Sequence, residues 1–211
     1  VINWGDATTT NQVNATSPTH VYASPGVYTV KITGTFYGFN FNNTQDRLKI
    51  ISITNWGNIA FGAEQTAAFR GCANLNITAT DLADFSAGTG APFSNMFSLC
   101  TSLNPPALKI NVANASSLQL MFVGCTALNS CPDFINNQNI VSLNALFQSC
   151  SSFNQDLIFD TSLVQQFTST FFGCQAYNRY PTFSTQSAIF LTALFSNCSS
   201  FNQSIDHLIT D

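Results

Sequence analysis

The chain has 211 residues, of which 45% are hydrophobic and only 8% are charged, and its formal net charge is −4. Since about a quarter of the residues of an average soluble domain are charged, Asn, Ser, Thr and Gln must supply most of the polar surface here. The six basic residues are scattered, which excludes a basic nucleic-acid-binding surface, and no apolar run approaches the roughly 18 residues of a membrane span.

The chain opens with a small β-rich segment. Residues 28–33 alternate between apolar and polar side chains, as a strand with one buried face does. A Pro-Gly pair just before them signals a turn, and residues 1–3 can pair with them as a second strand. This segment and the connection that follows it are expected to occupy residues 1–47.

Two polar residues of this segment invite a functional interpretation. Asp6, in the sequence Trp-Gly-Asp, could hold a metal or act as a catalytic acid, but an Asx-type turn explains it more simply. His20 has no acid or nucleophile at a defined spacing. We therefore interpret it as a packed or surface residue rather than as a base.

From residue 48 onward the chain repeats a short motif, Phe-x-x-Cys-x-x-[Leu/Phe/Tyr]-Asn. Six copies occur, their cysteines are separated by 28, 25, 25, 24 and 24 residues, and the repeat that contains the last copy is incomplete. The recurring positions, which we expect to form three structural ladders, are Phe69, Phe97, Phe122, Phe147, Phe171 and Phe195; Cys72, Cys100, Cys125, Cys150, Cys174 and Cys198; and Asn76, Asn104, Asn129, Asn154, Asn178 and Asn202.

The pattern inside one copy predicts a short helix followed by a short strand. In residues 143–150 the apolar side chains recur at i, i+3, i+4 and i+7, which is one face of a helix. Short extended stretches follow, as in 107–112 and 156–160, and residues 48–57 are expected to supply the first strand and a cap. One unit cannot close a core alone, so the sequence predicts an α/β repeat solenoid of the leucine-rich-repeat type over residues 48–211.

The recurring Asn predicts a hydrogen-bonded ladder of its own. A bend in the chain leaves backbone groups without partners. An inward-facing amide can both donate and accept hydrogen bonds. We therefore expect the Asn side chains to be buried and to bridge the bends of neighbouring coils.

Four interpretations are open for the seven cysteines. Thiols stacked in consecutive coils would point in parallel, which fits poorly with a disulfide. Zinc ligands usually come in closely spaced pairs, whereas the closest pair here, Cys125 and Cys131, has no His nearby. A catalytic thiol needs a base, and His20 and His207 lie at opposite ends of the chain. We favour small buried hydrophobic residues, expect no metal or cofactor, and assign no role to Cys131.

Two resemblances rest on these residues. The stretches LMFVGCTALN (120–129), ALFQSCSSFNQDL (145–157) and ALFSNCSSFNQSI (193–205) resemble the repeats of BspA-like leucine-rich-repeat surface proteins. The opening WGD with HVYASPGVYTVKITG resembles a PKD-type β-sandwich motif over part of its length. The resemblance implies a protein on the cell surface, outside the cell or on a virion surface, which mediates attachment and carries no catalytic residues.

The sequence therefore favours a non-catalytic interaction or adhesion protein, or an exposed structural component of a virus particle. Its partner would be a protein or glycan on a host or on a neighbouring subunit. An enzyme is disfavoured because Glu64 is the single Glu and the Asp residues form no catalytic pair. Asp81 and Asp84 flank a turn-like stretch and are more simply solvated.

A carbohydrate-binding module is the alternative function. Exposed aromatic rings would be its platform, and Trp56, Tyr177 and Tyr180 are the candidates, although Tyr177 is also a ladder position. The repeat that ends at Asp211 lacks a polar cap. We therefore also expect that the polypeptide continues past this point or that a partner covers this end.

Overall fold

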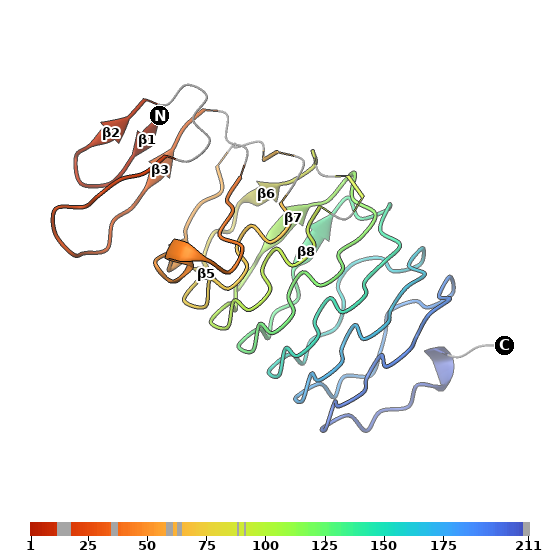
Figure 1. Cartoon of the computed structure of the whole chain (residues 1–211). Coiled ribbons are helices and arrows are strands. Elements are labelled where there is room, and N and C mark those ends of the chain that lie inside the picture. Colours follow the sequence, from red (N-terminus) through yellow and green to blue (C-terminus); the bar gives the residue numbers. More distant parts are fainter. Residues whose placement is uncertain are drawn as a thin grey trace. The chain divides into compact units, whose positions relative to one another are not determined.

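The computed structural model describes residues 1–11, 18–34, 38–57, 61–62, 65–87, 89–90 and 92–208 (Figure 1). The chain forms two compact units, Val1–Phe36 and Tyr37–Asp211. The boundary after residue 47 that the sequence suggested is therefore too late. The described residues of the expected connection belong to the second unit, because the backbone N–H groups of 41–43 donate to carbonyl oxygens of 67–70.

The first unit is built on three short antiparallel strands. Strand β1 (Ile2–Asn3) lies between β2 (Thr9–Thr10) and β3 (Lys31–Ile32). Ile2 is opposite Thr10 on one side and Ile32 on the other. The pairing with Ile32 is the one expected for the opening residues, whereas the strand at Thr9–Thr10 was not predicted. Ile2 is buried, whereas Val30 is 43% exposed, so the alternating pattern of this strand buries less than predicted.

The second unit places successive repeats side by side. Strands β4 (Ser52–Ile53) and β5 (Asn76–Ile77) pair in parallel, and β6 (Leu82–Asp84), β7 (Lys109–Asn111) and β8 (Asp133–Ile135) form a parallel sheet. Isolated parallel bridges from Ser117 through Ser142 and Gln166 to Phe190 extend the pairing along the later repeats. Figure 1 shows these repeats as a row of similar turns running toward the C-terminus. The remaining elements are two 3-10 helices, η1 (Gln45–Leu48) and η2 (Asp206–Leu208).

The predicted short helices are wrong: the described residues contain no α-helix. In residues 143–150, the N–H groups of the odd-numbered residues donate to carbonyl oxygens of the next repeat, from Gln166 to Phe172. The N–H groups of Leu146, Gln148 and Cys150 donate to the residue three positions earlier, closing tight turns. The expected apolar side chains are nevertheless buried, since a chain of turns gives them nearly the same spacing as a helix.

The backbone conformation explains why no helix forms. Each repeating Phe has a residue with positive φ two positions before it and another two positions after it. These residues are Ala67 and Gly71, Asn95 and Leu99, Leu120 and Gly124, Ala145 and Ser149, Ser169 and Gly173, and Ala193 and Asn197. A residue in the left-handed region cannot continue a right-handed helix. The N–H groups released from the helical pattern bond instead to the neighbouring repeat.

The two ends of the stack of repeats differ. At its beginning, the rings of Phe39 and Phe41 lie over Phe69, at centroid distances of 5.0 and 6.2 Å. In the sixth repeat, Ile189 is 65% and Phe190 is 51% exposed. Coverage of this end by further chain or by a partner stays a prediction.

Candidate functional site

The six repeating Phe side chains form a continuous aromatic stack. Neighbouring rings lie nearly parallel, within 16° of each other, with centroids 5.3 to 6.0 Å apart, from Phe69 to Phe195. Phe195, in the last repeat, is only half-buried, whereas the other five rings are fully buried. The stack thus fixes the spacing between repeats and forms the centre of the second unit.

The repeating cysteines form a second row, with a hydrogen bond that sequence reasoning missed. Each thiol from the second repeat onward donates to the carbonyl oxygen of the Phe in the repeat before it, with Sγ–O distances of 3.0 to 3.1 Å. All seven cysteines are free thiols. Cys suits this position because it is small and carries one weak hydrogen-bond donor. A hydropathy pattern treats Cys only as an apolar residue and so does not reveal this bond.

Burial suppresses the reactivity of these thiols. It raises the pKa of Cys72 and of Cys150 to about 12 and that of Cys198 to about 11, and it also raises the pKa of the other three repeating thiols. The same effect raises the pKa of Cys131 to about 12. Because the thiolate is the nucleophile and the metal ligand, neutral buried thiols suit packing. Across the residues that the structure describes, no group of three or more His, Cys, Asp or Glu side chains is placed to hold a metal ion.

The repeating Asn residues form the third row, at the rim of the stack. The Oδ1 atom of each of the first five accepts a hydrogen bond from the backbone N–H of the Asn in the next repeat, at 2.9 to 3.1 Å, so that the row runs from Asn76 to Asn202. The expectation that these side chains are buried is wrong: Asn104, Asn129 and Asn202 are exposed and the other three are half-buried. The amide bridges the bends from outside, because the bends themselves lie at the surface.

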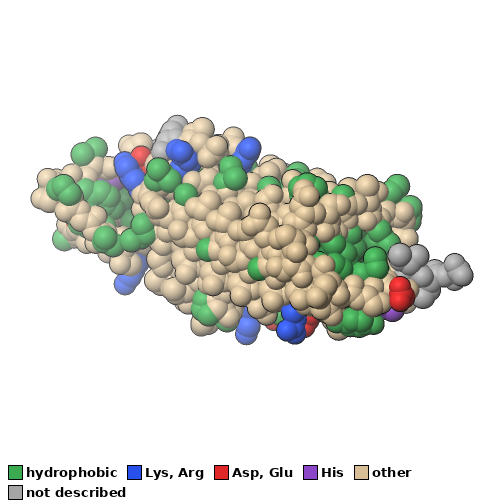
Figure 2. Space-filling view, turned by 90° about the horizontal axis from the view of Figure 1, so that it is seen from below, with side chains coloured by type: hydrophobic (Ala, Val, Ile, Leu, Met, Phe, Trp, Pro, Cys, Tyr) green, Lys and Arg blue, Asp and Glu red, His purple; other side chains and the backbone are tan. Residues whose placement is uncertain are grey.

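The sheet of β6, β7 and β8 has an inner face that is apolar throughout and an outer face whose side chains differ in character. On its inner face, Ala83, Ile110 and Phe134 are paired in register and buried. On its outer face, the paired residues at one position are an apolar, a basic and an acidic residue, namely Leu82, Lys109 and Asp133. Figure 2 shows a face of the molecule on which few Lys, Arg, Asp or Glu side chains are visible.

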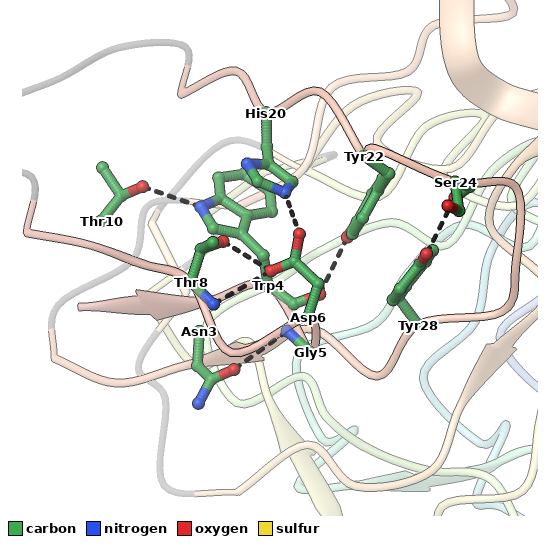
Figure 3. A network of polar contacts seen from close by, with 10 residues as sticks. All are labelled: Asn3, Trp4, Gly5, Asp6, Thr8, Thr10, His20, Tyr22, Ser24 and Tyr28. Carbon is green, nitrogen blue, oxygen red and sulfur yellow. Dashed lines mark hydrogen bonds and ion pairs between the residues drawn. The ribbon is translucent and has the colours of Figure 1, made fainter.

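In the first unit, Asp6 and His20 belong to one polar network (Figure 3). Asp6 forms an Asx turn, accepting hydrogen bonds from the backbone N–H and the hydroxyl of Thr8. Its Oδ2 lies 2.8 Å from Nε2 of His20, whose ring stacks on Trp4 with the centroids 4.8 Å apart. The view that His20 has no defined acid partner is therefore wrong. The two residues are 14 positions apart, so their spacing in the sequence gave no sign of the contact.

This network stabilises a charge rather than activating a nucleophile. The hydrogen bonds from Thr8, followed by the contact with His20, lower the pKa of Asp6 to about 2. The imidazole contacts the carboxylate and not the hydroxyl, so no base is directed at Thr8. Tyr22 donates to the carbonyl oxygen of Trp4 and stacks on Tyr28, which ties the same loop to the following segment.

Of the three aromatic candidates for a sugar platform, the structure leaves one. Trp56 is 4% exposed and packs edge-on against Phe61 and Phe85, so it cannot be a platform. Tyr177 is 1% exposed and lies within the aromatic stack. Tyr180 is 50% exposed.

Tyr180 borders a polar hollow of about 310 Å³, which Asp156, Asn178, Arg179 and Thr182 also line. The guanidinium of Arg179 donates to both carboxylate oxygens of Asp156, at 2.8 and 3.3 Å. The Tyr180 ring stacks on His207 with the centroids 4.5 Å apart. The hollow therefore combines an aromatic ring, a neutralised ion pair and an amide, and sequence spacing offered no signal for it beyond Tyr180.

The acidic residues considered for catalysis have structural partners or lie elsewhere. The Asp81 carboxylate accepts the backbone N–H groups of Trp56 and Gly57, at 2.7 to 3.0 Å. Asp84 accepts from Asn111 in the next strand, at 3.0 Å. The expectation that both are simply solvated is wrong, since each connects neighbouring segments. Glu64 lies outside the described residues.

Comparison with known proteins identifies one family. Its model, described as "Mycoplasma protein of unknown function, DUF285", matches residues 34–157 and 133–211. No curated protein and no solved structure matches the chain. In the part of the chain that the structure describes, no helix is long and apolar enough to cross a bilayer. Because the two matches together span the whole second unit, this chain belongs to the DUF285 family.

Proposed function

We propose that this chain is a non-catalytic interaction protein that binds its partner through the surface of the stacked repeats. The stack itself is best classed as a leucine-rich-repeat-like solenoid in which turns replace the helices. The partner is a protein or glycan on a host or on a neighbouring subunit. The chain acts in adhesion at a cell surface or as an exposed component of a virus particle.

One observation carries this proposal: the Phe, Cys and Asn positions that join neighbouring repeats recur, whereas the outward positions of the strands differ. Phe, Cys and Asn recur because stacking requires them, but Leu82, Lys109 and Asp133 occupy equivalent outward places in β6, β7 and β8. A rigid surface of non-recurring side chains on a recurring frame suits recognition of a large partner.

The chemistry of the side chains supports binding over catalysis. The repeating thiols are neutral because burial raises their pKa. His20 is held against Asp6, and Asp81 against backbone N–H groups. None of these groups pairs a nucleophile with a base in the way that a catalytic triad requires.

The family supports a surface location. DUF285 is associated with BspA-like surface repeat proteins, which agrees with the repeat resemblance of residues 48–211. The PKD-like resemblance of the first unit fits the same class of protein. A reducing or an oxidising compartment is compatible with free thiols that are buried.

Surface labelling tests the proposal. Antibodies against the chain should label intact source cells or purified virus particles, and protease added outside should remove the signal. The purified chain, carrying a fluorophore, should bind host cells saturably. Labelling that appears only after permeabilisation, together with no saturable binding, would overturn the proposal.

A further inference from the structure

The Asn row presents amide donors in a fixed orientation. Oδ1 of each Asn from Asn104 to Asn178 accepts the backbone N–H of the next repeat, and Oδ1 of Asn202 accepts the side-chain amide of Gln203, which fixes which end of each amide faces the protein. None of the described residues accepts a hydrogen bond from Nδ2 of Asn104, Asn129, Asn154, Asn178 or Asn202. These side chains are exposed or half-buried. The second unit thus carries a line of oriented N–H donors with no acceptor of its own.

The spacing of this line follows the spacing of the repeats. Stacked Phe rings of neighbouring repeats are 5.3 to 6.0 Å apart, and the Asn side chains belong to the same repeats. A ligand that matches the line must offer acceptors at a regular spacing of similar length. Successive sugar rings of an extended glycan chain do so.

The polar hollow adjoins the line one repeat before its last Asn, because Asn178 belongs to both. There the half-exposed ring of Tyr180 offers an apolar face beside hydrogen-bonding groups, which is the mixed surface that a sugar ring requires. His207 stacks on the ring and holds it in place, and its Nδ1 lies 2.9 Å from the Tyr180 hydroxyl.

The charges of the site indicate that the ligand is neutral. Arg179 is the one cationic side chain lining the hollow, and Asp156 already neutralises it. An acidic polysaccharide would need unpaired Lys or Arg residues for its anionic groups. An apolar peptide would need an apolar groove, whereas the lining side chains here are polar apart from the Tyr180 ring.

We propose that the Asn row and the hollow at Tyr180 form a binding site for a neutral, linear glycan chain. Tyr180 packs on one sugar ring, and the Asn Nδ2 groups donate to hydroxyl or acetamido oxygens of that ring and of the rings beyond it. This inference rests on the proposed function as an interaction protein and names the ligand class and the site.

Titration calorimetry of the whole chain with neutral hexasaccharides tests the site. The probes are cellohexaose, chitohexaose, xylohexaose and maltohexaose, with dextran sulfate as the acidic probe. At least one neutral probe should bind. Tyr180→Ala should weaken that binding by about tenfold or more, since it removes the packing surface. Asn178→Asp and Asn154→Asp should each weaken it about tenfold, since they remove a donor but keep the ladder acceptor.

Two matched variants control for exposure and charge. Phe190 is 51% exposed but does not line the hollow, so Phe190→Ala should bind within about twofold of the wild type. Gln138 is exposed and makes no described hydrogen bond, so Gln138→Glu adds the same charge as the Asn→Asp variants without removing a ladder donor.

Three outcomes overturn the inference: no binding of any neutral probe at millimolar concentration, binding of dextran sulfate alone, or equal losses in the site and control variants. Circular dichroism of every variant shows that it is folded. If host cells bind the chain saturably while no glycan does, the glycan site fails and the interaction function stands.

Discussion

The carbonyl oxygen of Phe122 accepts two hydrogen bonds, one from the backbone N–H of Cys125 in its own repeat and one from the thiol of Cys150 in the next. The distances are 3.1 and 3.0 Å. The first bond closes a turn within one repeat, and the second joins that repeat to the next. One oxygen atom therefore takes part both in the turn and in the contact between repeats. The thiol is therefore a specific connector as well as a core side chain.

Removing this thiol should weaken the stack. We expect Cys150→Ala to lower the free energy of unfolding by about 1–3 kcal/mol, through a small cavity and one lost hydrogen bond. Urea unfolding followed by circular dichroism measures the change. Cys131→Ala is the control, because its thiol is half-buried, lies outside the repeating Cys row, and donates a long hydrogen bond of 3.6 Å to the adjacent Pro132 carbonyl oxygen. Equal costs for the two variants would contradict the connector role.

The left-handed positions give a second prediction. Gly173 has φ of 71°, and a Cβ placed there meets Ser149 at an ordinary 3.6 Å. Gly173→Ala should therefore lower the free energy of unfolding only by the strain of a left-handed residue with a Cβ, about 1–2 kcal/mol. Ser149, with φ of 60°, carries that strain already, so Ser149→Gly should be stabilising. Urea unfolding measures the stability of both variants. A destabilised Ser149→Gly variant would show that the conformation of Ser149 is not strained.

The Asn side chains of the row use Oδ1 as the acceptor that holds the repeats together, whereas Nδ2 is the donor assigned to a ligand. Oδ1 of Asn129 accepts the N–H of Asn154 and the side-chain amide of Gln155. Asn129→Ala should lower the free energy of unfolding by about 1 kcal/mol, because both donors lose their protein partner at a solvated rim. Asn129→Asp keeps the acceptor and should unfold close to the wild type at neutral pH. If Asn129→Asp lowered the free energy of unfolding as much as Asn129→Ala does, loss of the Oδ1 acceptor would not explain the destabilisation.

Acid should loosen the first unit through Asp6. Its pKa is lowered to about 2, so the charged form stabilises the fold above the unfolded value near 4, and that stabilisation is lost as pH falls from about 4 to 2. In a Trp56→Phe background Trp4 is the single tryptophan, and it stacks on His20. Its fluorescence should change in this pH window. Asp6→Asn should abolish that transition, and an unchanged titration would exclude Asp6 as its source.

The sequence could predict the side chains that face inward but not the path of the backbone between them. The spacing from Leu143 to Cys150 marks buried positions equally well for a helix and for a series of turns. The choice between them depends on positive φ at Ala145 and Ser149, and neither residue type signals it. Glycine occupies only some of the equivalent positions, such as Gly124 and Gly173, so composition gives a weak signal.

Exposure was the other property that spacing could not supply. Asn104 was expected inside because its amide has a bridging role, but the bridge lies at the rim, where the bends are. Trp56 was a candidate for an exposed sugar platform, but it is buried because Asp81 fixes its backbone while Phe85 packs against its ring. The proximity of Asp156, Tyr180 and His207 depends on the stacking of different repeats, which no single repeat encodes.

The aromatic stack predicts that stability depends on position along the row of repeats. Phe147 is fully buried between Phe122 and Phe171, at 5.8 and 6.0 Å. Phe147→Ala should cost about 3–5 kcal/mol, because it opens a cavity that two neighbouring repeats line.

The matched variant is Phe195→Ala, whose ring is half-buried and has a Phe-row neighbour, Phe171, on one side only. Phe195→Ala should lower the free energy of unfolding clearly less than Phe147→Ala, because the stability of such a stack is a sum of contacts between nearest neighbours. Hydrogen exchange should locate the difference: Phe147→Ala should expose amides on both sides of its repeat, and Phe195→Ala only those of the last repeat. Equal costs with uniform exchange would mean that the second unit unfolds as one cooperative block rather than repeat by repeat.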